Sequence, residues 1–479
     1  MQKTYPSLSP QAAKRRQQHR RPAWRAAAAA CLVAGTLAAA PAFAAQDLMD
    51  VYQQAKQSDP QIKQAKAQYQ AAQEAKPQAR AGLLPQLNAG AEASRTHQET
   101  TYSNAPALLQ NSTQDYNTYQ YSINLTQPLF RWSTYKRLDQ ADASVAQAAA
   151  QYAAAEQDLM VRVANRYFGV LDAVDRLQVA QAQERAIKRQ LEQARQRHEV
   201  GLIARTAVEE AKARYDSARA DVIAAENAVD SAREALREIT GVPMGELAKV
   251  PSDIPLNSPK PNDAKAWADK AEEQNWQLTA SRHAAEAAMA NVGVQRGGHY
   301  PTLDLVGSYG EQDQSGGSFQ GAGQDVTSAT VGIQLNVPIF SGGATSSKVR
   351  QAQYQYTDAR ENLEQVHRSV LRQTADAYRG VESSIQRVKA LAQAKVSNKS
   401  ALDATQAGYE VGTRTIVDVL DAQQNYFQAQ RNYQQAVYDY LLNTLNLKQA
   451  AGTLGPDDLR AINGELRQGD EGGQGDQDQ

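Results

Sequence analysis

The sequence contains very little cysteine. Cys31 is its single cysteine, and it lies in an N-terminal segment that we expect to be removed from the mature protein. The mature chain then has no disulfide, no thiolate metal site and no cysteine nucleophile. An exported chain without disulfides must gain its stability from packing or from oligomerisation.

Long apolar runs and an excess of one charge are also missing. Beyond the N-terminal segment there is no run of about 18 apolar residues, so no transmembrane helix is predicted. The formal net charge of -1 points to neither nucleic acid nor another strongly charged partner. With a mean hydropathy of -0.62 the chain is polar. If such a chain crosses a membrane, it must use β-strands, whose alternating pattern barely registers on hydropathy scales.

The N-terminal segment, 1–44, has the three parts of an export signal. A basic region leads into an apolar stretch, 26–40, which is followed by a small-x-small cleavage site at 42–44. The alternative is an N-terminal membrane anchor, but Pro41 and the cleavage site end the apolar stretch early. The basic region consists of Lys14, Arg15, Arg16, Arg20, Arg21 and Arg25. We therefore predict a signal peptide.

An internal repeat is the clearest feature of what remains. The chain from about residue 125 to about residue 240 recurs about 211 residues later. In each copy apolar residues return at every seventh position, which is typical of supercoiled helices packed along narrow seams. The matching positions are Val208, Tyr215, Val222, Val229 and Leu236 in the first copy and Val419, Tyr426, Tyr433, Tyr440 and Leu447 in the second. A unit used twice indicates a pseudo-symmetric construction.

Four segments alternate apolar and polar residues, as strands with two different faces do. They form two predicted hairpins, at about 86–128 and about 302–338, and the clearest segment is 118–126. Each segment has about ten residues, enough for a tilted strand to cross the core of a bilayer. An ordinary half-buried sheet would show the same alternation, so the residues alone leave both interpretations open. We expect Pro128 and Pro338 to end the two ladders.

After each hairpin the heptad pattern predicts a long helix, then a turn at a Val-Gly pair, then a shorter return helix. At 1.5 Å per residue each long helix would span about 100 Å, which no ordinary core requires. The predicted helices are about 133–199 and 206–240 in the first copy and about 344–410 and 415–451 in the second, with turns at Val200-Gly201 and Val411-Gly412.

These elements divide the mature chain into segments. We predict a first repeat over 45–240, a proline-rich linker over 241–262 and a second repeat over 263–452. The tail, 453–479, is rich in Gly, Asp and Gln, and we predict that it is disordered.

This order of elements, present twice behind an export signal, resembles the TolC family of outer-membrane efflux and secretion ducts. The resemblance covers essentially the whole mature chain, and its most specific stretches are 47–55 (DLMDVYQQA) and 408–422 (GYEVGTRTIVDVLDA). It implies an α+β membrane protein that assembles as a homotrimer. Four strands per chain would close a twelve-stranded β-barrel, and the long helices would continue it as a coiled-coil barrel across the periplasm.

The resemblance also implies a function. The trimer would be the passive exit duct of a tripartite efflux pump, of a type I secretion system, or of both. A periplasmic adaptor (membrane fusion) protein and an inner-membrane ABC, RND or MFS transporter would be its partners, and drugs, small toxic molecules or polypeptides its cargo. The alternative is a periplasmic structural or adaptor coiled-coil protein without a channel.

Asp418 and Asp421 are candidate site residues because their i, i+3 spacing places them on one helix face. Acidic residues in a first helical turn also complement the helix dipole, so the pair has a purely structural interpretation. The resemblance implies that both face the pore at its periplasmic constriction, where three chains would form an acidic ring that binds cations. Crowding of like charges would raise some of the carboxylate pKa values.

The turns carry two further sets of candidate residues. The resemblance implies that Tyr409, Arg414 and Thr206 form a latch that holds the duct closed. The alternative is that they are polar surface residues without a specific role. The chain departs from the family at Ala207, where the family has an Asp, and we expect its closed state to be less firmly latched. The residues implied in docking of the adaptor are Val200, Gly201, Leu202, Val411, Gly412 and Thr413.

No pattern in the sequence indicates an enzyme. The histidines of the mature chain lack metal-ligand spacing, and no phosphate-binding loop or nucleophile elbow occurs. We therefore expect no catalytic residue, no metal site beyond possible cation binding at the acidic ring, and no cofactor.

Overall fold

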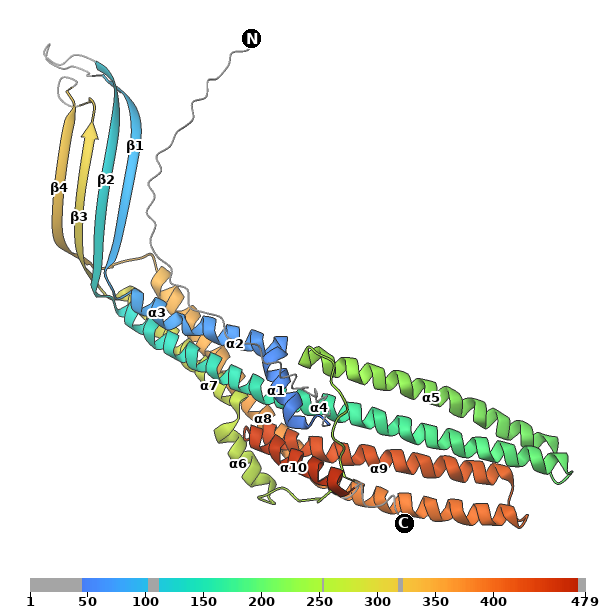
Figure 1. Ribbon diagram of the computed structural model, residues 1–479. Helices are drawn as coiled ribbons and strands as arrows, with labels where there is room; N and C mark the ends of the chain where they lie inside the picture. Colours follow the sequence, from blue (N-terminus) through green and yellow to red (C-terminus); the bar gives the residue numbers. More distant parts are fainter. Residues whose placement is uncertain (1–44, 102–111, 252–253, 318–321, 473–479) are drawn as a thin grey trace, which may run out of the picture. The chain divides into compact units, whose positions relative to one another are not determined.

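The computed structural model describes residues 45–101, 112–251, 254–317 and 322–472, so the predicted signal peptide lies outside the described residues. The chain is an α+β protein (Figure 1), which confirms the predicted fold class. Its elements are α1 (Leu48–Ser58), α2 (Pro60–Gln73), α3 (Ala75–Ala81), β1 (Gln86–Thr100), β2 (Ser112–Phe130), α4 (Trp132–Glu199), α5 (Arg205–Thr240), α6 (Ala264–Gln274), α7 (Trp276–Arg296), η1 (Gly297–His299), β3 (Thr302–Gln314), β4 (Gln324–Asn336), α8 (Ala344–Glu410), α9 (Ile416–Ala450) and α10 (Pro456–Gly472).

The four strands form one antiparallel sheet in the order β1-β2-β3-β4. The strands carry large apolar side chains, as the alternation in the sequence predicts. The rest of the described chain does not cover these side chains, so they are exposed. They are Leu87, Tyr119, Tyr121, Ile123, Tyr309, Val326, Val331, Ile333 and Leu335. The outer strands, β1 and β4, each have one side without a partner strand within the described chain.

Pro128 does not end the ladder, and that prediction was wrong. β2 continues to Phe130, with Pro128 opposite Asp304 of β3 and a register shift between Pro128 and Phe130. A proline, which has no N–H to donate, is tolerated at such an irregularity. The guanidinium of Arg131, at the start of α4, then donates two hydrogen bonds of 2.8 Å to the Asp304 carboxylate. This bidentate pair fixes the corner where strand becomes helix.

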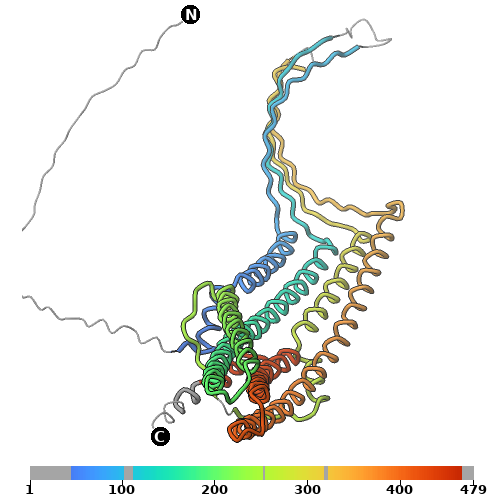
Figure 2. The backbone as a smooth tube through the Cα atoms, turned by 90° about the vertical axis from the view of Figure 1, so that its right-hand side faces the viewer, coloured from blue at the N-terminus to red at the C-terminus, as the bar shows by residue number. Residues whose placement is uncertain are grey.

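The two long helices, α4 with 68 residues and α8 with 67, each span about 100 Å. Figures 1 and 2 show α5 alongside α4 and α9 alongside α8, so the two copies of the sequence repeat form two helical hairpins. α4 also contacts α9, which joins the hairpins. Among the described residues no helix is both long and apolar enough to span a membrane.

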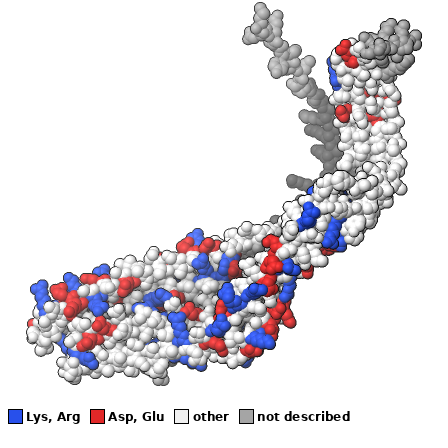
Figure 3. All heavy atoms as spheres, turned by 180° about the vertical axis from the view of Figure 1, so that it is seen from behind, with Lys and Arg blue, Asp and Glu red and all other residues white. Residues whose placement is uncertain are grey.

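The main core lies where α1, α4, α9 and α10 meet. Tyr167 and Phe168 of α4 are fully buried there, and the Phe168 ring stacks on Tyr438 of α9 at 5.8 Å between centroids. Aromatic side chains of this size contribute strongly to a core through the area that they bury. The face shown in Figure 3 carries many charged side chains over the helices and few over the sheet.

The prediction of disorder from residue 453 was wrong for 456–472, which form α10. Leu459 and Leu466 of this helix are fully buried. The side chain of Asn463 accepts a hydrogen bond from the Leu48 N–H at 3.0 Å and donates one to the Asp47 carboxylate at 2.8 Å. The polar composition of this segment predicted disorder. The segment nevertheless folds as a helix, because its apolar residues recur at helical spacing and pack against α1.

Candidate functional site

Both Val-Gly turns have the same backbone geometry. Gly201 and Gly412 adopt φ angles of 77° and 80°, a left-handed conformation that side chains disfavour. The Leu202 N–H donates to the carbonyl of Arg197 at 2.8 Å, and the Thr413 N–H donates to that of Gly408 at 2.8 Å. These are Schellman caps, so each long helix ends in the same way.

The turns expose apolar side chains. Val200 is 70% exposed, Leu202 72% and Val411 75%. This exposure leaves three large apolar groups in solvent at the end of the two hairpins. The candidate docking residues therefore lie at the surface, and the described chain does not cover them.

The return helices begin differently in the two copies. At the start of α9, Thr415 and Asp418 form a capping box, in which the Asp418 N–H donates to the Thr415 hydroxyl at 3.2 Å and the Thr415 N–H donates to the Asp418 carboxylate at 2.8 Å. The corresponding residues of α5 are Ala204 and Ala207, and no side chain caps that helix. The repeat is thus asymmetric at its turns.

Asp418 is held by Thr415 in this chain. The backbone N–H and the hydroxyl of Thr415 both donate to its carboxylate, and these bonds lower the pKa of Asp418 below its usual value. Within the single chain this is opposite to the rise predicted from crowded like charges. In a single chain, Asp418 therefore acts as part of the N-terminal cap of α9.

Asp421 pairs with a residue that sequence analysis did not single out. The Arg214 guanidinium of α5 donates to the Asp421 carboxylate at 2.8 Å and to the Gln424 side-chain oxygen at 3.0 Å. Residues 214 and 421 belong to different copies of the repeat, so sequence spacing gives no sign of their contact.

Tyr409 lies in the interior rather than at the surface. Its side chain is 7% exposed, and the Arg197 guanidinium lies over its ring, 4.4 Å from the centroid. No described residue forms a hydrogen bond with its buried hydroxyl. Ala207, where a carboxylate was expected from the family pattern, packs against the cluster that contains Tyr409.

The three candidate latch residues are not joined to one another. Thr206 is exposed in the first turn of α5, and the Arg414 side chain is exposed beyond the end of α8. Within the described chain no hydrogen bond links either side chain to Tyr409. What holds this end together is an apolar cluster from all four helices: Ile187, Leu191, Ala194, Ala211, Ala218, Tyr409, Ile416, Val419 and Leu420.

A polar contact between α4 and α9 lies farther along the hairpins. The Tyr438 hydroxyl donates to the Asp175 carboxylate at 2.5 Å. Burial raises the pKa of Asp175, although the Tyr438 bond and nearby Lys249 oppose the shift. Burial beside Asp175 also raises the pKa of the Tyr438 hydroxyl, which therefore remains a proton donor.

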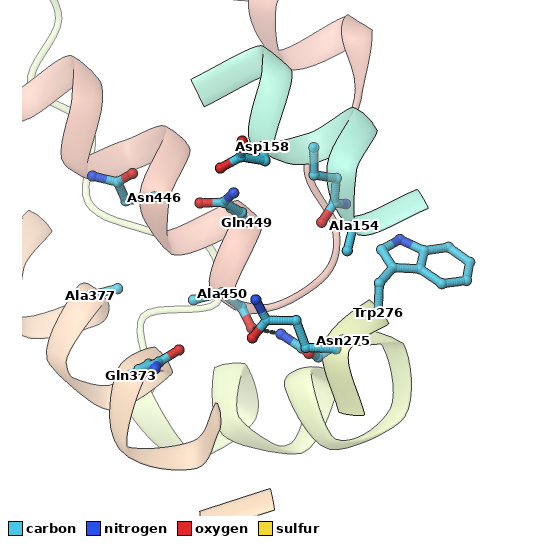
Figure 4. Close-up of a pocket in the computed structure, with 11 residues that line it drawn as sticks. Ala154, Asp158, Asn275, Trp276, Gln373, Ala377, Asn446, Gln449 and Ala450 are labelled. Atoms are coloured by element: carbon cyan, nitrogen blue, oxygen red, sulfur yellow. Dashed lines mark hydrogen bonds between the residues drawn. The ribbon is translucent and has the colours of Figure 1, made fainter. Parts of the chain in front are cut away.

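A pocket of about 370 Å³ lies where α4, α7, α8 and α9 meet. Figure 4 shows Asn275 donating to the Ala450 carbonyl, at 2.9 Å, and the Thr374 hydroxyl donates to the same oxygen at 3.2 Å. Asn275 also caps α7 by accepting the Leu278 N–H at 3.0 Å. We assign these side chains a structural role, because they satisfy helix ends.

Among the described residues, no three His, Cys, Asp or Glu side chains come together as a metal site. The chemistry available at the helical turns is thus electrostatic and apolar: carboxylates, nearby guanidinium groups and exposed apolar side chains. Such groups attract ions and contact other proteins.

Comparison with known proteins identifies the family. Residues 51–242 and 267–453 match the family described as "Outer membrane efflux protein". The chain is 39% identical to the "Outer membrane protein TolC" of Vibrio cholerae, over 90% of this chain and 96% of that protein. It is 30% identical to the "Alkaline protease secretion protein AprF" of Pseudomonas aeruginosa, over 87% of this chain and 86% of the relative.

Solved structures show the same fold. A membrane protein from Pseudomonas aeruginosa superposes with a TM-score of 0.71 at 23% identity, over 85% of this chain and 93% of that one. The resemblance drawn from the sequence is confirmed, since the match extends through both copies of the repeat. The chain belongs to the outer membrane efflux protein family, and its location is the outer membrane.

Proposed function

We propose that the protein is the passive exit duct of an export system, and that three copies form one duct. The observation that carries this proposal is the four-stranded sheet, whose apolar side chains are exposed and whose outer strands each have one side with no partner strand among the described residues. In lipid, unpaired backbone groups are too costly to persist, so the sheet must close with strands from other copies. Three copies would give a twelve-stranded barrel.

The helical hairpins provide the rest of the conduit. We infer that the two repeats, 45–240 and 263–452 with the linker 241–262 between them, place their long helices side by side around one axis. A length of about 100 Å suits a passage through the periplasm. The protein itself would perform no chemistry, so energy must come from a partner.

The partner would be an inner-membrane ABC, RND or MFS transporter that reaches the duct through a periplasmic adaptor. Exposed Val200, Leu202 and Val411 at the two turns are suited to this contact, because apolar groups rimmed by polar residues mark protein interfaces. Gly201, Gly412 and Thr413 set the backbone of the same surface.

We expect the inner-membrane transporter, rather than the duct, to select the cargo. One relative is named for outer-membrane localisation alone and another for secretion of a protease. The family description names efflux, so drugs and small toxic molecules are candidate cargo for this chain, and the protease-secreting relative makes polypeptides a candidate as well.

We assign the periplasmic constriction to Asp418 and Asp421. Three chains would contribute six carboxylates around the axis, a charge arrangement that favours cations. Tyr409 and Arg414, with Thr206 of the first copy, lie at the helix ends that must move for this constriction to widen.

Single-channel conductance of the detergent-extracted trimer in a planar bilayer tests the proposal, with and without a trivalent cation on the side of the helical turns. A small, cation-selective conductance that the ion blocks is expected, and Asp418→Ala with Asp421→Ala should abolish the block. A large conductance without block would remove the constriction assignment. No conductance from folded, membrane-extracted protein would favour the alternative of a structural coiled coil.

Docking has a separate test. Leu202→Asp with Val411→Asp should abolish cross-linking of the adaptor to the duct in cells while leaving trimer assembly intact. Ile223→Asp, the same change at an exposed position of α5 about 30 Å from the turn, is the matched control. Equal loss in both variants would argue against docking at the turns.

A further inference from the structure

Arg214 makes a forked contact with α9. One guanidinium nitrogen lies 2.8 Å from the Asp421 carboxylate and the other 3.0 Å from the Gln424 side-chain oxygen, one turn farther along the helix. The planar guanidinium presents two donors in a fixed geometry, which an ammonium cannot do. The contact is therefore directional as well as charged.

The pair lies near the surface. The Arg214 side chain is 45% exposed and that of Asp421 52%. Water screens such a pair, so it contributes little to stability. Its main effect is electrostatic, because it places a positive charge beside the Asp421 carboxylate.

The contact has no counterpart in the other copy of the repeat. The positions that correspond to Arg214 and Asp421 are Asn425 and Glu210. They cannot form an ion pair with each other. The contact therefore occurs at one of the two equivalent places in the repeat and does not follow from the repeat itself.

Charge around Asp421 can be counted from the neighbouring elements. On its own helix Asp418 is a carboxylate held by Thr415 and acted on by the positive charge of Arg414, and α5 brings Arg214. Asp418, Asp421 and Arg214 together carry one net negative charge per chain, and Arg414 is a further positive charge near Asp418. Removing Arg214 would make the net charge of this group more negative by one.

We infer that Arg214 is a specificity-determining residue of the constriction, which partly neutralises Asp421 and so limits the binding of multivalent cations. The inference rests on the proposed function, because it requires Asp421 to face the conduit. Since the attraction of an ion grows with the net charge of the ring and with its own valence, a trivalent cation should sense Arg214 most strongly.

Arg214→Gln tests the inference in the trimer, in a planar bilayer at low salt. This change keeps a side chain that can donate to Asp421 but removes the charge. We expect the concentration of hexaammine cobalt(III) that halves the conductance to fall about tenfold, and cation selectivity to rise. Thermal stability should stay close to that of the wild type.

Two variants keep the result interpretable. Arg214→Gln with Asp421→Asn restores the wild-type net charge and should restore the wild-type block. Arg237→Gln removes the same charge from α5 about 35 Å away, where Arg237 pairs with Glu234 of its own helix, and should change nothing.

Failure of the inference and failure of the proposed function give different results. If wild type conducts and Asp421→Asn weakens the block, but Arg214→Gln leaves it unchanged, Arg214 has no compensating role. An equal effect of Arg237→Gln would also overturn the inference, because it would reflect total charge. Absence of any conductance from folded wild-type trimer would instead overturn the proposed function.

Discussion

The Arg197 guanidinium lies over the ring of Tyr409, 4.4 Å from its centroid, and so joins the last turns of α4 and α8. A cation held against an aromatic face in a partly buried site contributes about 1 kcal/mol. The hydroxyl of the same tyrosine forms no hydrogen bond with any described residue. The ring of Tyr409, rather than its hydroxyl, therefore adds to the apolar cluster that joins the two hairpins.

Arg197→Gln should therefore loosen the hairpin ends. We expect a loss of about 1 kcal/mol in the free energy of unfolding and a higher resting conductance. Tyr409→Phe is the matched control, because it keeps the ring and removes a buried group without a partner, so stability should be unchanged or slightly higher. A larger loss from Tyr409→Phe than from Arg197→Gln would contradict this account. Urea unfolding and bilayer recording supply the measurements.

Ala207→Asp should lower the resting conductance. A carboxylate in the first turn of α5 would be stabilised by the helix dipole and would offer an acceptor near the cluster that buries Tyr409. In the Tyr409→Phe background the same substitution should have a smaller effect, since no hydroxyl remains to donate. If Ala207→Asp leaves resting conductance as it was, the idea of a loosely latched closed state must be dropped.

Ala204→Thr should stabilise the protein by about 1 kcal/mol. Position 204 is the N-cap of α5 and has no side-chain bond, whereas the corresponding Thr415 caps α9. A hydroxyl there would accept a hydrogen bond from an N–H of the first helical turn, as the Thr415 hydroxyl does from the Asp418 N–H. Thr415→Ala should produce a loss of the same order, and chemical denaturation of both variants compares the two copies directly. No gain from Ala204→Thr would indicate that solvent already satisfies this end.

Asp175 should make stability depend on pH. Because burial raises its pKa in the folded chain, the folded state holds a proton that the unfolded state has lost. The contribution of this group to stability thus falls as pH rises from about 3.9, the ordinary value, through the raised folded value. Asp175→Asn keeps an acceptor for Tyr438 but cannot ionise. Relative to wild type, its melting temperature should improve as the pH rises above about 3.9. A difference that is constant with pH would speak against a raised pKa.

Sequence reasoning predicted the elements whose signal is periodic. The heptad seam through Val208 and Val419 predicts long paired helices, and alternation around residues 118–126 predicts a strand, because both patterns arise from backbone geometry alone. Helix ends at Gly201 and Gly412 were also predictable, since only glycine adopts their conformation readily.

Side-chain contacts between the copies were not predictable in this way. The spacing of Arg214 and Asp421 does not show that α5 and α9 are in contact at these residues. Nor does the residue type of Tyr409 show that its hydroxyl lacks a hydrogen-bond partner among the described residues. The helix over 456–472 was missed because its polar composition resembles that of a disordered tail. Such features depend on which surfaces pack together in the folded chain, and the local sequence pattern does not show this.

Asn463 gives the chain a particular order of assembly. Its amide satisfies the Leu48 N–H and binds Asp47, so α1 has its N-terminal end completed by a residue 415 positions farther along the chain. Closing a loop of this length costs chain entropy that a local contact does not. The capping box of Asp47 and Asp50 can therefore form from neighbouring residues, whereas the Leu48 N–H gains its acceptor only after residue 463 has been synthesised and α10 has packed against α1.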